Sequence, residues 1–306
     1  MDDKGTKLRI YGSLAAGLIA FGFAPILVRA AEGYHPVVVA GYRTVFAALC
    51  LIPFWLADLR KNRKDKAEKA THEPRKEWMA VLAGFFLSVH FILWISSITL
   101  TSVASASVLV AIHPIILIIA ESLFLKRRFA GFVWLGVIIS FLGSASLGFA
   151  DHGVESHMPN PVLGDILAVA AAFVFVLYFL IGQQLRQSYS WIQYVFRVYG
   201  YTAIFTAIII LLGGFDWTPE PRLILVGLGL AIGPQIMGHG SMNFAVKYIS
   251  PTLLGSLILV EPIIATFLAL IFFAEFPTIM AIIAMFITLG GVILAWFAGR
   301  KKKQPA

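Results

Sequence analysis

Two titratable residues stand directly before prolines in two apolar stretches of the chain, His113 before Pro114 and Glu261 before Pro262. Each lies roughly ten residues into a stretch of about 23, which is near the midplane of a membrane at 1.5 Å per helical residue. A proline removes one helical hydrogen bond, so these positions can act as hinges or offer carbonyl groups to a ligand. Pro25 is a third candidate hinge.

Glu261 is the strongest candidate for proton coupling. A carboxylate in apolar surroundings is costly when charged, so it can take up and release a proton near neutral pH. His113 is also titratable, so the two residues can share the task or His113 can perform it alone. The alternative is structural: a packed glutamic acid, protonated or paired with Arg197 or His113, that only fixes the fold.

Polar side chains recur at helical spacing in two further apolar stretches, which puts each set on one helical face. The two stripes are His90, Trp94, Ser97 and Thr101, and Gln235, His239, Asn243 and Lys247. Polar groups inside a membrane usually face the protein interior or a wet cavity. We therefore expect the stripes to line a substrate site, with Tyr178 beside them. Snorkelling to the headgroups is the alternative for His239.

Arg43 and Arg197 are charged residues inside apolar stretches, at matching positions measured from opposite ends. A guanidinium group can pair with a buried carboxylate or with a substrate carboxylate through its planar fork of donors. We expect charge pairing or gating by both residues. Snorkelling to the headgroups is again the alternative.

These residues belong to a chain that is largely apolar: 306 residues, 59% hydrophobic and 13% charged, with a mean hydropathy of +0.86. Apolar stretches of about 20 residues recur, and each is long enough to cross a membrane as a helix. We place ten spans near residues 10–29, 36–57, 78–99, 103–125, 129–149, 162–182, 190–212, 222–245, 250–273 and 277–299. The fold class is therefore an all-α membrane protein. The single cysteine, Cys50, lies in a span, so we expect no intrachain disulfide, metal or cofactor.

Lys and Arg are distributed unevenly between the loops, and short loops rich in them stay in the cytoplasm. Twenty of the 24 Lys and Arg residues fall on one side when ten spans are threaded through a membrane, and both chain ends are on that side. We therefore expect a multi-pass protein of the bacterial inner membrane with both termini cytoplasmic. The net charge of +8 then reflects topology and not binding to nucleic acid.

The chain also repeats itself with a period of about 150 residues. At an offset of 148, the segment 108–116 falls on 256–264 without a gap, so that His113-Pro114 meets Glu261-Pro262. Because each repeat has five spans, the second copy enters the membrane from the opposite side. We expect two inverted five-helix halves, 1–149 and 162–299, around a central cavity, with a periplasmic linker over 150–161. Chance similarity between apolar segments is the alternative.

In these features the sequence resembles the EamA branch of the drug/metabolite transporter superfamily. The resemblance covers nearly the whole chain and rests on the ten spans, the repeat and local motifs: Tyr42-Arg43, Pro114, Glu261-Pro262, Ala274-Glu275 and the closing Gly290-Gly291. The chain departs from the family where Tyr42 replaces a common tryptophan and where His113 is matched by Glu261. Members are secondary transporters, often exporters of amino acids or other metabolites, with a cavity between the halves.

We accordingly expect a secondary active transporter that exports a small metabolite, an amino acid or a related zwitterion, with protons as the coupling ion. An importer or exchanger of a larger metabolite, such as a nucleotide derivative, is the alternative. Enzymatic activity is not expected, because the sequence has no H-E-x-x-H, no G-x-S-x-G and no cysteine near a histidine. A channel lacks support from any acidic ring or filter-like segment. The expected partners are the small-molecule substrate, membrane lipid and protons, and we expect a monomer.

Overall fold

The computed structural model describes residues 4–61, 73–101, 103–150, 159–273 and 276–300. Within these ranges all regular structure is helical. The helices are α1 (Lys4–Arg29), α2 (Pro36–Lys61), α4 (Pro74–Leu100), α5 (Val103–Val110), α6 (His113–Leu123), α7 (Gly131–Ala150), α8 (Pro161–Ser188), α9 (Trp191–Gly213), α10 (Pro221–Leu230), η2 (Ala231–His239), α11 (Gly240–Ala245), α12 (Pro251–Ile258), α13 (Glu261–Phe273) and α14 (Ile279–Arg300).

Most of these helices are long and apolar. In the described part of the chain nine segments are long and apolar enough to cross a membrane, and Gly131–Ser146 of α7 is a shorter apolar segment. The predicted all-α class is therefore confirmed with nine to ten apolar spans, and the chain is a multi-pass membrane protein. Some helices run further than predicted: α2 continues to Lys61 and α8 continues to Ser188. Most of the linker predicted over 150–161 lies outside the described residues.

Prolines and polar caps set several helix ends. Prolines occupy the first position of α2, α4, α8, α10 and α12, where the missing N–H would have no helical partner in any case. Ser190 and Gln193 form a reciprocal capping box at the start of α9. The same helix ends at Gly214, whose positive φ of 63° is the left-handed conformation that glycine adopts without strain.

The fourth and ninth spans are each broken in two inside the membrane. In the first half α5 ends at Val110 and α6 begins at His113; in the second half α12 ends at Ile258 and α13 begins at Glu261. The proline after each titratable residue falls in the first turn of the new helix, where its ring and its missing N–H are tolerated. Each half therefore carries one break at its predicted proline position.

The eighth span is continuous but irregular. Residues Ala231–His239 wind as a π-helix around Pro234, between the α-helical segments α10 and α11. A π-helix turns by fewer degrees per residue than an α-helix. The stripe predicted from four-residue spacing, which starts at Gln235 and His239, therefore does not lie on one face of this span. Helical segments of this kind are frequent at functional sites.

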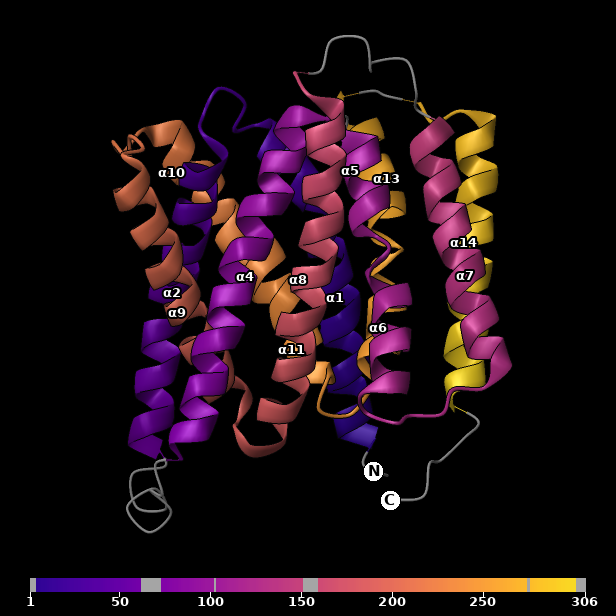
Figure 1. Cartoon of the computed structure of the whole chain (residues 1–306), viewed down its shortest axis with the longest axis horizontal. Helices are drawn as coiled ribbons and strands as arrows, with labels where there is room; N and C mark the ends of the chain where they lie inside the picture. Colours follow the sequence, from indigo (N-terminus) through magenta and orange to yellow (C-terminus); the bar gives the residue numbers. More distant parts are fainter. Residues whose placement is uncertain (1–3, 62–72, 102, 151–158, 274–275, 301–306) are drawn as a thin grey trace.

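The two halves interleave across the molecule. α4 packs along α8 and α2 packs along α9, so each of these contacts joins one helix from each half. α7 and α14, the last helices of the two halves, pack against each other at one side of the molecule (Figure 1). Both chain ends lie at the same face, which we call the terminal face (Figure 1). The largest buried cluster runs through α1, α2, α4, α8, α9 and α10.

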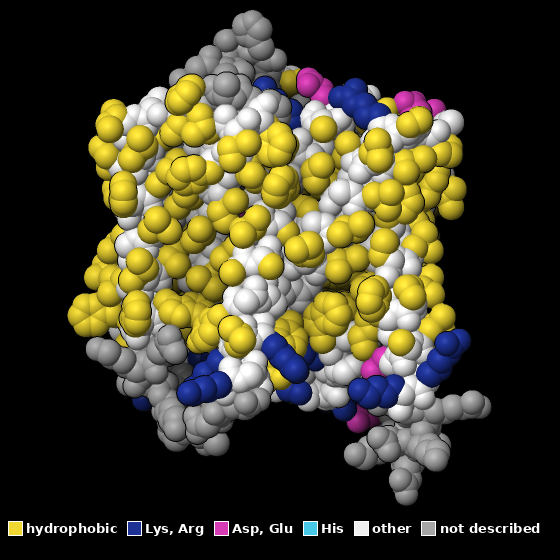
Figure 2. Space-filling model, turned by 180° about the vertical axis from the view of Figure 1, so that it is seen from behind, with side chains coloured by type: hydrophobic (Ala, Val, Ile, Leu, Met, Phe, Trp, Pro, Cys, Tyr) yellow, Lys and Arg dark blue, Asp and Glu magenta, His cyan; other side chains and the backbone are white. Residues whose placement is uncertain are grey.

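The outer surface is apolar across the middle of the molecule, as contact with lipid requires. Figure 2 shows a broad hydrophobic band, with the Lys and Arg side chains of this face concentrated at the edge that carries the terminal face. Large apolar side chains such as Phe132, Leu211 and Phe286 are 64%, 78% and 72% exposed. In water such a surface would drive aggregation, whereas in a bilayer it is the normal lipid-facing surface.

Close packing of α7 against α14 depends on glycine. A methyl group on Gly291 would overlap the backbone of Ser140, whereas one on the adjacent Gly290 would meet no atom within 4 Å. We predict that Gly291→Ala lowers the free energy of unfolding by about 1–3 kcal/mol, the usual cost of an overpacked interface. Gly290→Ala is the matched control and should leave stability unchanged. Thermal unfolding of the detergent-solubilised variants measures the difference; equal melting temperatures would contradict the packing described.

Candidate functional site

A cavity of about 70 Å³ lies where the two broken spans meet the interleaved helices. Its volume in this conformation holds only a few water molecules. Both halves contribute to the lining: Phe21 and Ala24 from α1, Arg43 from α2, His90, Phe91 and Trp94 from α4, Ser107 and Val110 from α5, Ala111 and His113 at the first break, Phe175 from α8, His239 from η2, and Ile258, Glu261 and Pro262 at the second break.

The two helix breaks bring His113 and Glu261 to this cavity. Each residue begins a helix, α6 or α13, that runs away from the cavity. The amide groups at a helix start carry no helical partner and present a partial positive charge, which stabilises a carboxylate placed there. Glu261 occupies such a position, so its anionic form has local support from the backbone as well as from any cation in the cavity.

Arg43 supplies that cation. Its side chain is 1% exposed, its Nε donates to Oε1 of Gln235 at 3.1 Å, and its guanidinium carbon lies 3.7 Å from the ring centroid of Phe91. The stacked ring and the amide hold the guanidinium in place on one side of the cavity. Within the described residues no ion pair joins Arg43 to Glu261, so the guanidinium and the carboxyl group face one small space without pairing directly.

Two histidines of the cavity are oriented by backbone carbonyl groups. Nδ1 of His90 lies 2.9 Å from the carbonyl oxygen of Ala171, and Nδ1 of His113 lies 3.0 Å from that of Val110. A carbonyl oxygen only accepts, so Nδ1 carries the proton in both rings and Nε2 is the nitrogen left to accept a proton or a ligand. The third ring, His239, lies 6.2 Å from His90 between ring centroids.

Behind the cavity wall lies a fully buried chain of hydrogen bonds. Tyr178 donates to Oδ1 of Asn243 at 2.7 Å, and Tyr199 donates to the carbonyl oxygen of Gln235 at 3.0 Å. The amide nitrogen of Asn243 reaches the Tyr199 hydroxyl at 3.4 Å. Because Gln235 also holds Arg43, this chain fixes the cation of the cavity from the second half of the molecule.

Only some of the predicted site residues line the cavity, and the others lie behind it or elsewhere. Those that line the cavity are His90, Trp94, His113, His239, Glu261, Arg43 and Pro262. Tyr178, Gln235 and Asn243 lie in the chain of hydrogen bonds behind the cavity, and Ser97 donates to the carbonyl oxygen of Trp94 in its own helix at 2.7 Å.

The remaining predicted residues lie away from the cavity lining. Thr101 is the C-cap of α4, Pro114 follows the first break, and Pro25 is buried inside an uninterrupted α1 beside Ala24. Lys247 lies at the terminal face and lines a second, larger cavity there.

Arg197 lies outside the cavity, unlike its repeat partner Arg43. It donates to Glu77 at 3.2 Å and to the carbonyl oxygen of Gln193 at 3.1 Å, near the terminal face. Tyr201 donates to the same Glu77 at 2.5 Å. The pairing of Arg197 with Glu261 that the sequence left open is therefore wrong, because Glu77 on the neighbouring α4 provides a nearer carboxylate.

Trp94 was predicted to line the cavity, but the three phenylalanines of its wall were not. Phe21 and Phe91 lie 5.0 and 5.2 Å from the ring of His239, and Phe175 lies 5.0 Å from the ring of His113. A signal was present, since Phe91 precedes Trp94 and Phe175 precedes Tyr178 by three residues, which places each pair on one helical face. In a chain with 25 phenylalanines, however, position along one helix does not distinguish a ring that lines a cavity from one that faces lipid.

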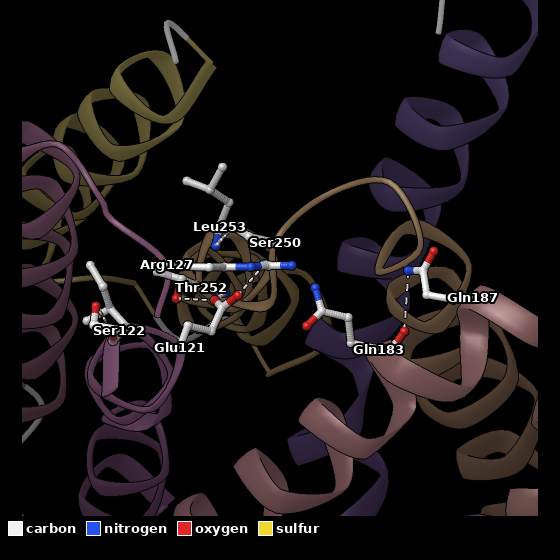
Figure 3. A network of polar contacts seen from close by, with 9 residues as sticks. Glu121, Ser122, Arg127, Gln183, Gln187, Ser250, Thr252 and Leu253 are labelled. Atoms are coloured by element: carbon white, nitrogen blue, oxygen red, sulfur yellow. Dashed lines mark hydrogen bonds and ion pairs between the residues drawn. The ribbon is translucent and has the colours of Figure 1, made fainter. Parts of the chain in front are cut away.

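A second polar cluster lies on the terminal side of the central cavity, and Figure 3 shows its contacts. Glu121 of α6 is fully buried and accepts from the backbone nitrogen and the hydroxyl of Thr252 in α12, at 2.7 and 2.5 Å. It also pairs with Arg127, whose guanidinium lies 2.7 Å from the side-chain amide of Gln183 in α8. This cluster, the latch, joins the first half to the second on the terminal side of the cavity.

Comparison with known proteins decides the family. The model of the EamA-like transporter family matches residues 9–149 and again residues 162–297. The chain belongs to the EamA-like transporter family. Its members are transporters of the drug/metabolite transporter superfamily. The resemblance of the sequence to the EamA branch is therefore confirmed.

Two relatives and one solved structure agree with this membership. The chain is 27% identical to the "Uncharacterized transporter YdfC" of Bacillus subtilis (strain 168), over 99% of this chain and 95% of that protein. It is 24% identical to "Solute carrier family 35 member G1" of Mus musculus, over 92% of this chain and 77% of that protein. A crystal structure with 17% identity superposes with a TM-score of 0.73, over 96% of this chain and 99% of that chain, which shows a shared fold.

Three histidines and a glutamate in one EamA cavity raise the question of a metal. Within the described residues no group of three or more His, Cys, Asp or Glu side chains is placed to hold a metal ion. The ring of Phe175 packs against His90, His113 and His239, with 5.3, 5.0 and 6.0 Å between ring centroids. The cavity therefore offers separate hydrogen-bonding and titratable groups inside an aromatic shell.

Trp94 provides a direct test of this cavity as a binding site. We predict that Trp94→Ala weakens substrate binding by about thirtyfold, because truncating a buried aromatic contact typically costs about 2 kcal/mol. Trp78→Ala is the matched control, since Trp78 lies in the same helix and is 62% exposed. Binding of standard amino acids to purified protein by isothermal calorimetry measures the effect. Equal affinities of the two variants for whichever ligand binds wild type would contradict the assignment.

Proposed function

We propose that this EamA-family transporter exports a small zwitterion, an amino acid or a close relative, across the bacterial inner membrane in exchange for protons. The observation that carries the proposal is that a guanidinium, of Arg43, and a titratable carboxyl group, of Glu261, line one small aromatic cavity. Export is the direction adopted because members of the family are often exporters. We also propose the functional halves 1–149 and 162–299, joined over 150–161.

The charges of the cavity suit the two ends of an amino acid. The planar guanidinium of Arg43 matches a carboxylate, for which it can offer two parallel N–H donors. Glu261 and the faces of Phe91, Trp94 and Phe175 suit an ammonium group and an apolar side chain. Such a ligand carries no net charge at neutral pH, so its two charges can be met without leaving an unpaired ion inside the membrane.

The size of the cavity favours a small substrate over a nucleotide derivative. A volume of about 70 Å³ must widen even for an amino acid, and a nucleotide with its phosphates would need a much larger opening and more cations. Arg43 is the one guanidinium among the residues that line the described cavity. The importer or exchanger of a large metabolite is therefore the weaker candidate.

Proton coupling is proposed to act through Glu261. When it is ionised, Glu261 attracts the substrate ammonium group and is balanced by Arg43 and the helix start. When it is protonated, that attraction disappears and the substrate is released. Proton binding and substrate binding therefore compete for one group, which is the thermodynamic requirement for exchange of one against the other. His113, at the matching break, is the second candidate for the proton.

The two breaks and the latch support an alternating-access cycle. The segments α6 and α12 pack together on the terminal side, where the latch of Glu121, Arg127 and Thr252 joins them. With the termini in the cytoplasm, this closes the cytoplasmic path and leaves Trp94 and Ser107 toward the opposite face. Opening to the cytoplasm then requires the latch to separate, with the chain bending at Pro114 and Pro262.

Glu261→Gln tests the proton-coupling step, because it keeps the shape of the side chain and removes its titration. We predict that the variant, like wild type with Glu261 protonated, binds substrate more weakly but still exchanges labelled substrate in proteoliposomes at saturating concentration. Accumulation driven by an imposed pH gradient falls to the level of this simple exchange. Glu77→Gln is the control, because Glu77 pairs with Arg197 outside the cavity. This substitution should leave accumulation of substrate intact. If Glu261→Gln concentrates substrate as well as wild type, with the same pH dependence, coupling through Glu261 is refuted.

A further inference from the structure

A second cavity opens at the terminal face, outside the central site. It has a volume of about 500 Å³, a size suited to a small-molecule ligand, whereas the central cavity has about 70 Å³. It lies between the start of α1, the α6–α7 connection, the end of α8, the α11–α12 connection and the end of α14. Both halves of the chain therefore form its wall, as they do in the central cavity. We call this larger cavity the vestibule.

A thin layer of protein separates the vestibule from the central cavity. Along α12, Leu253 lines the vestibule, and Ile258, five residues later, lines the central cavity. Five residues of helix rise by about 7.5 Å, which is the depth of the barrier along that helix. The latch lies in this layer, because its Arg127 lines the vestibule while Glu121 is fully buried behind it.

Close packing of α6 against α12 closes the layer. A methyl group on Gly255 of α12 would lie 2.8 Å from Cδ1 of Leu117 in α6, and 3.4 Å from Cδ2 of His113 in the wall of the central cavity. Leu117 is fully buried, so it has little room to move aside. The two helices therefore touch at the terminal side of the central cavity. Separating them would join that cavity to the vestibule.

A different polar route leads from the central cavity toward the terminal face, between α8, α9 and α11, but hydrogen bonds fill it. Asn243 accepts from Tyr178 and donates to Tyr199, and Arg186 donates to the carbonyl oxygen of Asn243 at 2.8 Å. None of these described residues lines the vestibule. Opening this route would break several buried hydrogen bonds and would not reach the larger cavity.

We propose that the vestibule is the cytoplasmic entrance of the transport path, where a small zwitterion is held until α6 and α12 separate and admit it to the central cavity. The inference rests on the alternating-access transport proposed above. It adds the route of the substrate, a second site that the substrate occupies, and the contact that bars its way. We call that contact, between Leu117 and Gly255, the gate.

Labelling of a cysteine in the central cavity tests the route without a known substrate. Ser107→Cys is introduced into a chain whose Cys50 is replaced by alanine, and a membrane-impermeant maleimide is applied to right-side-out or inside-out vesicles. Gly255→Ala overpacks the closed gate. It should therefore raise the labelling rate from the cytoplasmic face by about tenfold, the usual scale of an overpacked contact. Labelling from the periplasmic face should not rise.

Gly182→Ala is the matched control for the other route. A methyl group on Gly182 would overlap the hydroxyl group of Tyr194, so this variant overpacks the contact between α8 and α9 beside the hydrogen-bonded tyrosines. If the substrate enters by way of the vestibule, Gly182→Ala should be labelled like the parent chain from both faces.

Gln187→Trp tests the vestibule itself, because Gln187 is an exposed residue of α8 that lines it. The larger side chain should slow the labelling of Ser107→Cys from the cytoplasmic face and leave labelling from the periplasmic face unchanged. Gln184→Trp is the matched control, since Gln184 is exposed in the same helix but is not among the residues of the vestibule wall.

Four results would overturn the proposed route. Faster cytoplasmic labelling in Gly182→Ala and not in Gly255→Ala would place the path along the tyrosines. Equal rises at both faces in Gly255→Ala, or no change in it, would show that the contact with Leu117 is not the gate. Equal labelling rates in Gln187→Trp and Gln184→Trp would remove the vestibule from the path. Failure of amino acids to bind or to be transported, with the expected labelling pattern intact, would refute the proposed substrate and leave the route standing.

Discussion

Backbone amide and carbonyl groups inside a membrane must find partners within the protein, and the central site depends on this constraint. A helix can be interrupted in the hydrocarbon layer only where the freed groups face protein or a polar cavity. This chain interrupts two repeat-related spans, at Ala111–Ile112 and at Leu259–Val260, and both interruptions adjoin the same cavity. The prolines that follow keep each new helix from joining the old one. The breaks thus create the cavity and also supply its titratable residues, His113 and Glu261.

Burial of charge is the second constraint, and it links the central site to the latch. Arg43 is tolerated in the protein interior because Gln235 and Phe91 hold it and Glu261 lies across the same space. Glu121 is tolerated because Arg127 and Thr252 surround it. Removing one partner of such a group leaves an uncompensated charge, which is strongly destabilising. The packing of α6 against α12 therefore depends on the ion pair between Glu121 and Arg127 and on the hydrogen bonds from Thr252. Such a contact can separate when a transporter changes conformation.

Much of this architecture could be predicted from residue order. Hydropathy locates the ten spans, and the repeat aligns His113-Pro114 with Glu261-Pro262, so the two breaks follow from helix physics. The neighbours of a side chain could not be predicted. The internal repeat places Arg43 and Arg197 at equivalent positions, but their environments differ because Glu77 lies beside Arg197 and not beside Arg43. The π-helix at Ala231–His239 changes the phase of its stripe, so Gln235 and Asn243 support the cavity from behind while His239 lines it. Glu121 lies inside the predicted span 103–125, but its partner Thr252 is 131 residues away, so the sequence does not reveal the pairing.

The central claim is that the cavity at the two breaks is the substrate site and is reached from each face in turn. Labelling of a cysteine at Ser107, in a chain whose Cys50 is replaced by alanine, tests it most directly, because Ser107 lines the cavity. A membrane-impermeant maleimide applied to right-side-out or inside-out vesicles should label this cysteine from both faces. Saturating substrate should protect it in both preparations. Labelling from one face only, or labelling that no transported substrate slows, would contradict the account.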